Sequence, residues 1–195
     1  MNAVQIAAAL PAITHSNLTA DRLINRNWLY AHACQRRPDL EIGPTGGTPH
    51  LRRWIVQRGP LGTMYLHFIQ GAAPEHAHDH PWDSVTRVLF GWYEEDTWTA
   101  TPAGPERQGI ERRRHGDVIH RRAEEPHRII ATAPEGCWTL LETGPHRRAW
   151  GFLCPNGWRP WQAYVDPADP GRVGQGCGET DAPPGPRLAA REMGA

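Results

Sequence analysis

The feature that most limits the fold of this chain is a series of short β-rich segments between His50 and Cys154. Val, Ile, Thr and aromatic residues are frequent in these segments, and Gly or Pro separates them, which is typical of strands joined by turns. No helical pattern lies between them, so antiparallel pairing is favoured over a parallel sheet with crossover helices. About eight strands of this kind predict an all-β antiparallel sandwich or barrel. The segments are 51–58, 62–70, 84–98, 116–122, 127–132, 137–144 and 148–154.

The segments on either side of this region have different patterns. Apolar residues recur at helical spacing over 16–37, and Pro38 ends the run, so the sequence predicts a helix there. After Val165 the chain is rich in Gly, Pro and Asp and has too little apolar surface to offset the entropy of ordering it. We therefore expect an N-terminal segment at 1–47, a barrel at 48–165 and a flexible tail at 166–195.

Charge and hydropathy exclude two classes of partner. The 195 residues include 21 Lys and Arg and 21 Asp and Glu, so the chain has no net basic field with which to bind nucleic acid. No apolar stretch reaches the roughly 18 residues needed to span a bilayer. The first residues lack the basic start of a secretion signal, and Pro11 interrupts their apolar run. We expect a cytoplasmic protein that acts on a small molecule, bound to neither nucleic acid nor membrane.

The four cysteines are widely separated in the sequence. Cys34, Cys137, Cys154 and Cys177 form no C-x-x-C pair. Disulfide frameworks are typical of short secreted chains, which this chain does not resemble. The sequence therefore predicts four reduced thiols.

Three histidines lie close together in the segment EHAHDHPWD, at 76, 78 and 80. In a strand, alternate residues face the same side, so His78 and His80 can present both imidazoles to one point. Imidazole is a common ligand of divalent iron, zinc, nickel and copper. A third ligand must come from another segment, and His127, which begins a later strand, is the best candidate. A solvated strand edge is the alternative explanation of the cluster.

Two blocks of the sequence resemble the two motifs of the cupin superfamily. GAAPEHAHDHPWDSVTRVLFG resembles the first, with His78 and His80 as its histidine pair and Gly91 at its closing turn. HGDVIHRRAEEPHRII resembles the second and ends in His127. The blocks HDHPWD, GDV…HRI and TGP…WGFLCPNGW are also similar to those of a subgroup of uncharacterised bacterial and phage cupins. The resemblance implies a cupin (jelly-roll) barrel, one bound divalent metal ion held by His78, His80 and His127, and allows a homodimer.

The sequence departs from the general cupin motif at one position. In most cupins three or four residues separate the second histidine from a glutamate, and at those positions this chain has Ser84 and Val85. Asp83 lies one position earlier and should face away from the two histidines by alternation, although Pro81 can disturb that pattern. Two models follow: a neutral three-histidine site, which we favour, and a site in which Asp83 or another acid is a fourth ligand.

Further residues near the motifs are candidates for supporting roles. Asp79 and Asp83 could accept imidazole N–H bonds and thereby orient the ligands. Aromatic and small residues of the same region could line a substrate pocket, and ordinary core packing is the alternative for each. The candidate pocket-wall residues are Trp82, Ser84 and Trp92. The candidate catalytic acid/base residues are His67 and Tyr93.

The resemblance and the missing glutamate favour dioxygen chemistry. A three-histidine set resembles that of the thiol dioxygenases and diketone-cleaving dioxygenases of the superfamily, which implies a mononuclear iron (Fe2+) dioxygenase acting on a small molecule. Zn2+, Ni2+ or Mn2+ would instead suit a non-redox isomerase, lyase or hydrolase. A non-catalytic cupin that holds a metal ion for stability is the third hypothesis.

Overall fold

Two antiparallel sheets form the body of the molecule, and the predicted all-β antiparallel fold is confirmed. The computed structural model describes residues 33, 35–43, 47–73 and 76–178. One sheet has the strand order β1-β2-β3-β9-β4-β7 and the other the order β6-β5-β8. Their bounds are β1 (Leu40–Ile42), β2 (Leu51–Gly59), β3 (Gly62–Ile69), β4 (Ser84–Phe90), β5 (Trp92–Thr101), β6 (Gly104–Arg114), β7 (Val118–Arg121), β8 (His127–Thr132) and β9 (Cys137–Thr143).

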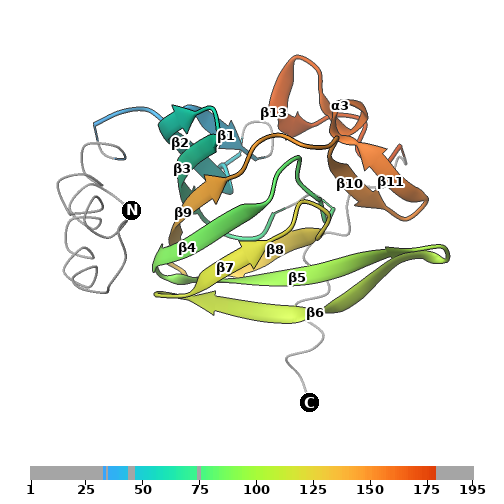
Figure 1. Ribbon diagram of the computed structural model, residues 1–195, viewed down its shortest axis with the longest axis horizontal. Coiled ribbons are helices and arrows are strands. Elements are labelled where there is room, and N and C mark those ends of the chain that lie inside the picture. Colours follow the sequence, from blue (N-terminus) through green and yellow to red (C-terminus); the bar gives the residue numbers. More distant parts are fainter. Residues whose placement is uncertain (1–32, 34, 44–46, 74–75, 179–195) are drawn as a thin grey trace.

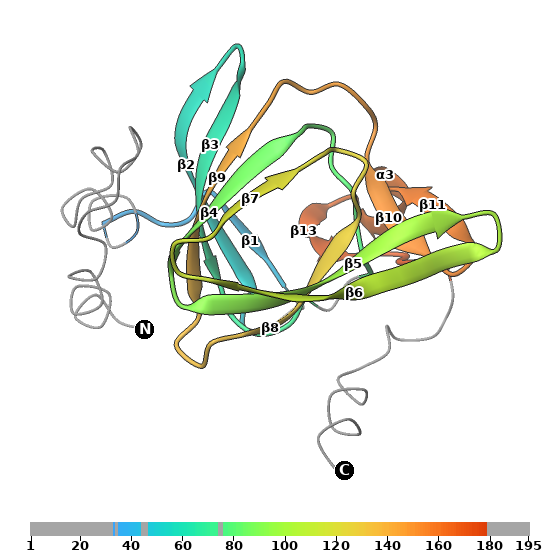
Figure 2. The ribbon, with the colours of Figure 1, turned by 60° about the horizontal axis from the view of Figure 1, so that its bottom comes forward.

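The chain alternates between the two sheets in the manner of a jelly roll. It passes from β4 to β5 in the other sheet, returns at β7, crosses again at β8 and comes back at β9 (Figures 1 and 2). The strand pairs are nested along the chain: β4 pairs with β9, and β5 and β8, which lie between them in the sequence, pair with each other. Gly91 makes the turn between β4 and β5 at φ 74°, where a Cβ would lie 2.3 Å from the carbonyl oxygen of Gly136. A side chain cannot fit there, which explains the glycine that the sequence placed at this turn.

The two faces of the six-stranded sheet bury different residues. One face carries an aromatic cluster that includes Trp54, Phe68 and Trp138. The opposite face is turned toward the second sheet, because its apolar cluster combines Ile69, Val88, Ile119 and Cys137 with Tyr93 of β5. We call this second cluster, together with Leu51 and Ile129 packed against it, the apolar floor of the barrel.

A polar layer lies directly beside the apolar floor. Alternate strand residues share a face, so the residue two positions along from a floor residue also faces the barrel interior. In seven strands that residue is polar or charged, and one of them is the predicted ligand His127. The seven are Arg53 on β2, His67 on β3, Thr86 on β4, Glu95 on β5, Arg121 on β7, His127 on β8 and Thr139 on β9. The barrel interior is therefore apolar in one part and strongly polar in the next.

The chain past the barrel continues as a small substructure. It consists of β10 (Gly151–Cys154), β11 (Gly157–Pro160), α3 (Trp161–Tyr164), β12 (Val165–Asp166) and β13 (Asp169–Val173). β13 pairs with β12, and the carbonyl oxygen of Gly171 accepts a hydrogen bond of 3.2 Å from the amide of Gly43 near β1. In Figure 1 this substructure lies above one end of the long β5–β6 hairpin.

The expected flexible tail is wrong for residues 166–178. These residues are ordered by backbone pairing and by a covalent link instead of by apolar burial, which is why composition did not reveal them. The six-stranded sheet also begins at Leu40, before the expected barrel boundary at 48. Nearly all of the helix predicted at 16–37, and the tail at 179–195, lie outside the described residues.

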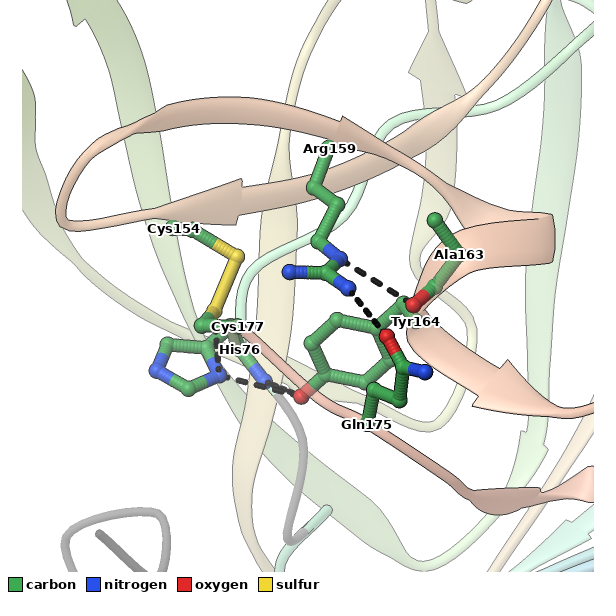
Figure 3. The surroundings of a disulfide bond; sticks show 7 residues. All are labelled: His76, Cys154, Arg159, Ala163, Tyr164, Gln175 and Cys177. Carbon is green, nitrogen blue, oxygen red and sulfur yellow. Dashed lines mark hydrogen bonds between the residues drawn. A yellow bond between two sulfur atoms is a disulfide. The ribbon is translucent and has the colours of Figure 1, made fainter. Parts of the chain in front are cut away.

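The prediction of four reduced cysteines is also wrong. Cys154 at the end of β10 forms a disulfide with Cys177, 23 residues later (Figure 3). Beside it, His76 Nδ1 lies 3.0 Å from the Tyr164 hydroxyl oxygen and 3.4 Å from Cys177 Sγ. Spacing along the sequence could not show that β12 and β13 return the chain to β10. Cys137 is a buried free thiol, and Cys34 lies outside the described residues.

None of the helices in the described part of the chain is both long and apolar enough to cross a bilayer.

Candidate metal centre

The backbone brings the three candidate ligands together from two distant segments. His78 and His127 exchange two backbone hydrogen bonds of 3.0 Å as an isolated antiparallel bridge. The amide of His80 donates to the carbonyl oxygen of Ala123 at 2.9 Å, so the first motif is bound to the second at two points. Because His78 and His80 are separated by one residue, both side chains extend to the side where His127 begins β8.

The three imidazole rings form a nearly equilateral triangle. The distances between ring centroids are 5.1 Å for His78 and His80, 5.3 Å for His78 and His127, and 5.3 Å for His80 and His127. One nitrogen of each ring lies within 4.8 Å of the others. His80 Nε2 and His127 Nε2 are 3.1 Å apart, close to the separation of about 3 Å expected for two nitrogens bound to one ion at metal–nitrogen distances near 2.1 Å. The site therefore fits one divalent ion.

A buried carboxylate orients the third ligand. Glu95 on β5 is fully buried, and its Oε2 accepts a hydrogen bond of 2.7 Å from Nδ1 of His127. Since Nδ1 carries the proton, the lone pair of His127 is on Nε2, which faces the other two rings. Histidines that bind a metal ion through one ring nitrogen commonly donate the other N–H to a carboxylate in this way, which fixes the orientation of the ring.

Two arginines hold the carboxylate in its ionised state. Arg121 donates to Glu95 Oε2 at 2.6 Å, and Arg113 donates to Oε1 at 2.8 Å. Burial alone would raise the pKa of Glu95, but His127, Arg121 and Arg113 together hold that pKa well below its usual range. Burial lowers the pKa of His80 well below the ordinary value, and the charges around it lower it further. His80 is thus neutral near pH 7, as a metal ligand must be.

The two aspartates predicted to support the ligands have other partners. Asp79 accepts hydrogen bonds from Arg148 at 2.7 Å, the amide of Gly151 at 2.7 Å and the indole of Trp158 at 3.0 Å. It therefore joins the motif to the β10–β11 substructure. Asp83 accepts from the amide of Ala123 and from Arg147, and its side chain is 56% exposed. Neither aspartate bonds to a ligand imidazole, and the cluster of metal-binding side chains in the described chain contains only the three histidines.

The predicted pocket-wall residues lie in three different settings. Trp82 stacks on the His80 ring, with centroids 4.6 Å apart and planes inclined by 11°. Ser84 is buried at the start of β4, opposite Arg121 of the polar layer. Trp92 instead packs under the guanidinium of Arg112 on the solvent side of the β5–β6 hairpin, so the structure does not bring it to the histidines. Alternation explains this, since Trp92 precedes the inward-facing Tyr93.

The two predicted acid/base residues also differ. Tyr93 belongs to the apolar floor, and burial raises the pKa of its hydroxyl far above the ordinary value, which does not suit proton transfer near pH 7. His67 belongs to the polar layer, where its Nε2 accepts a hydrogen bond of 2.8 Å from Arg53. Burial and the Arg53 charge lower the pKa of His67 well below its ordinary value, so this ring is neutral.

Sequence reasoning missed Glu95 and Arg53. Both occur in strands that were predicted, two residues from an apolar position that faces the barrel interior. Phe152 also contacts His78, at a centroid distance of 5.5 Å, which could not be expected from its place in the sequence. The alternation of Tyr93 and Glu95 was the one available signal, because it assigns a carboxylate to the interior of the barrel.

No family model matches the sequence, and no curated protein matches it. Several solved cupin-fold structures are similar to this chain. KdgF from Halomonas sp. is 22% identical with a TM-score of 0.40, over 51% of this chain and 83% of KdgF. A conserved Klebsiella pneumoniae protein with a double-stranded β-helix domain is 15% identical with a TM-score of 0.43, over 58% of this chain and 90% of that one. Oxalate decarboxylase from Bacillus subtilis, which has Mn(II) centres, is 13% identical with a TM-score of 0.45, over 61% of this chain and 30% of that one. The likeness concerns the fold alone.

Proposed function

We propose that this chain is a metal-binding cupin of the HDHPWD subgroup and a mononuclear iron dioxygenase that acts on a small molecule. The observation that carries the proposal is the triangle of three imidazoles, one of which is oriented by a buried, ionised glutamate. Three imidazoles are neutral ligands that leave open positions on an octahedral ion. When bound, the ion would polarise a substrate oxygen or activate dioxygen.

The surrounding residues provide the conditions for such chemistry. Trp82 on one side, and Trp150 and Phe152 beside His78, cover the rings with apolar surface and limit the access of water. Glu95 keeps His127 in one tautomer and one orientation. The neighbouring His67 is held neutral and can donate a hydrogen bond from Nδ1, since its Nε2 already accepts one from Arg53.

The first experiment tests metal binding. Protein purified without a nickel column is analysed for its elements, and the metal-free protein is titrated with Co2+ under anaerobic conditions while visible absorption is recorded. His127→Ala should lower the affinity for Co2+ by about 10-fold or more. His120→Ala is the matched control, because His120 is exposed on β7. Unchanged affinity in the His127 variant would remove that residue from the site.

A second measurement separates dioxygenase activity from the non-redox alternatives. Oxygen uptake by the iron-loaded protein is recorded with small thiols and β-diketones. Bound iron with substrate-dependent uptake supports the proposal. Stoichiometric zinc without any oxygen consumption would contradict it and favour an isomerase, lyase or hydrolase, or a non-catalytic module.

A further inference from the structure

We propose that the polar layer beside the metal centre is an anion-binding subsite in which Arg53, His67 and Thr139 receive a negatively charged group of the substrate. This inference rests on the proposed function, since the metal ion would hold the other end of the same molecule. The substrate class is therefore a small organic anion with a separate metal-binding group.

The three residues lie side by side on adjacent strands. In the sheet register Arg53 of β2 is opposite His67 of β3, and His67 is opposite Thr139 of β9. Each is two residues from a member of the apolar floor, at Leu51, Ile69 and Cys137, so all three face the barrel interior. The row therefore forms one continuous polar strip across three strands on the inner face of the sheet.

Arg53 is a guanidinium without an acid partner. Its Nε donates to the neutral His67 at 2.8 Å, and its charged group lies over the Tyr65 ring at 4.7 Å. No carboxylate of the described chain forms an ion pair with Arg53, and its two terminal nitrogens have no acceptor there. Burial lowers the pKa of Arg53, and Arg53 is among the charges that lower the pKa of His80, which agrees with a position facing the metal centre.

Thr139 provides a second, independent indication of a ligand. The residue is 1% exposed, and its hydroxyl has no hydrogen-bond partner. Buried hydroxyl groups are normally paired, because leaving one unpaired costs about 1–3 kcal/mol. A bound anion beside Arg53 would accept from the Thr139 hydroxyl, from the guanidinium and from the Nδ1–H of His67.

The charge of the layer also favours an anion. Arg53 and Arg121 contribute two positive charges to this layer, and Glu95 contributes one negative charge. A divalent ion would add two further positive charges in a region of low dielectric constant. A negatively charged substrate would offset this charge, whereas a cationic one would be repelled.

The experiment uses cobalt-loaded full-length protein and two series of probes. Malonate, succinate and glutarate place one carboxylate on the metal and a second at increasing distance, while acetate, propionate and butyrate lack the second carboxylate. Dissociation constants come from changes in the visible spectrum of Co2+. We expect at least one dicarboxylate to bind about 10-fold or more tightly than the monocarboxylates, the effect of a charge-assisted hydrogen bond.

Variants assign this preference to the subsite. Arg53→Gln should abolish the dicarboxylate preference without lowering the affinity for Co2+, and Arg58→Gln, an exposed arginine of the same strand, should leave the preference intact. Thr139→Val keeps the shape of the side chain and should weaken dicarboxylate binding several-fold, which tests the subsite even if Arg53→Gln does not fold. A wild-type protein without any dicarboxylate preference, or a preference that survives both variants, would overturn the subsite and leave the metal centre intact. A wild-type protein that binds no Co2+ would overturn the proposed function and the subsite with it.

Discussion

Replacing Glu95 by Gln should affect both stability and metal binding. The substitution keeps the shape of the side chain but removes the one negative charge that Arg121 contacts in the described part of the chain, and the Arg121 side chain is 9% exposed. Removing one partner of a buried ion pair costs about 3–5 kcal/mol, because the remaining charge stays buried without compensation. Arg113 keeps its contact with Glu111 and is 23% exposed, so it adds little to this cost. We expect the free energy of unfolding of Glu95→Gln to fall by about 3 kcal/mol.

Metal affinity should fall as well, for a different reason. A neutral amide orients His127 less strongly than a carboxylate does and makes its Nε2 a weaker donor. The loss of such a partner typically lowers metal affinity by about 10- to 100-fold. Urea unfolding of the metal-free protein measures the first effect, and Co2+ titration of the folded protein measures the second.

The neighbouring residue provides the matched control. Glu94 pairs with Arg112 at 2.6 Å on the solvent side of the same strand, where the two side chains are 25% and 45% exposed. Glu94→Gln should change the free energy of unfolding by less than about 1 kcal/mol and leave Co2+ affinity unchanged. If Glu95→Gln behaved like Glu94→Gln in both assays, the carboxylate would neither stabilise the barrel nor support the ligand.

Two other predictions concern the aspartate and the cysteines. Asp83→Asn should leave the Co2+ stoichiometry near normal, because Asp83 is bound to Arg147 away from the imidazoles; a complete loss of bound metal would instead favour the four-ligand model. A thiol reagent should count two thiols per chain in denaturant and four after reduction, since Cys154 and Cys177 are paired. In the native protein Cys137 should not react, because burial raises its pKa to about 12; four thiols before reduction would disprove the disulfide.

Most strands of the barrel could be predicted because each combines a short run of apolar and β-branched residues with turn residues such as Gly or Pro at its ends. Segment 62–70 became β3 and segment 127–132 became β8, almost residue for residue. β6 was missed, because its residues are mostly charged and exposed and it pairs only with β5 at the edge of the sheet. Such a strand is held in place by backbone hydrogen bonds to the neighbouring strand. Because any residue type except proline can make these bonds, the strand has no hydrophobic pattern that the sequence could show.

The clustering of the three histidines could be predicted, whereas the residues that support them could not. His78 and His80 are one residue apart in a strand-like pattern, and His127 follows a recognisable turn, so all three are local signals. Glu95, Arg121 and Arg113 come from three different strands, and their contact depends on the register of both sheets. Proximity in the sequence suggested Asp79 and Asp83 instead, but both face the connection to β10 and β11.

The polar layer nevertheless follows a regularity that relates sequence to function. A residue of the apolar floor such as Tyr93, Ile119 or Ile129 identifies the inward face of its strand. Because alternate residues of a strand share a face, the residue two positions away, on the side of the polar layer, faces inward too. When that position holds Glu, Arg or His, its desolvation has to be offset by a partner inside the barrel. Glu95, Arg121 and His127 offset one another. Arg53 obeys the same alternation, but its partners among the described residues are a neutral imidazole and an aromatic ring, and this imbalance is the physical reason to expect a negatively charged ligand there.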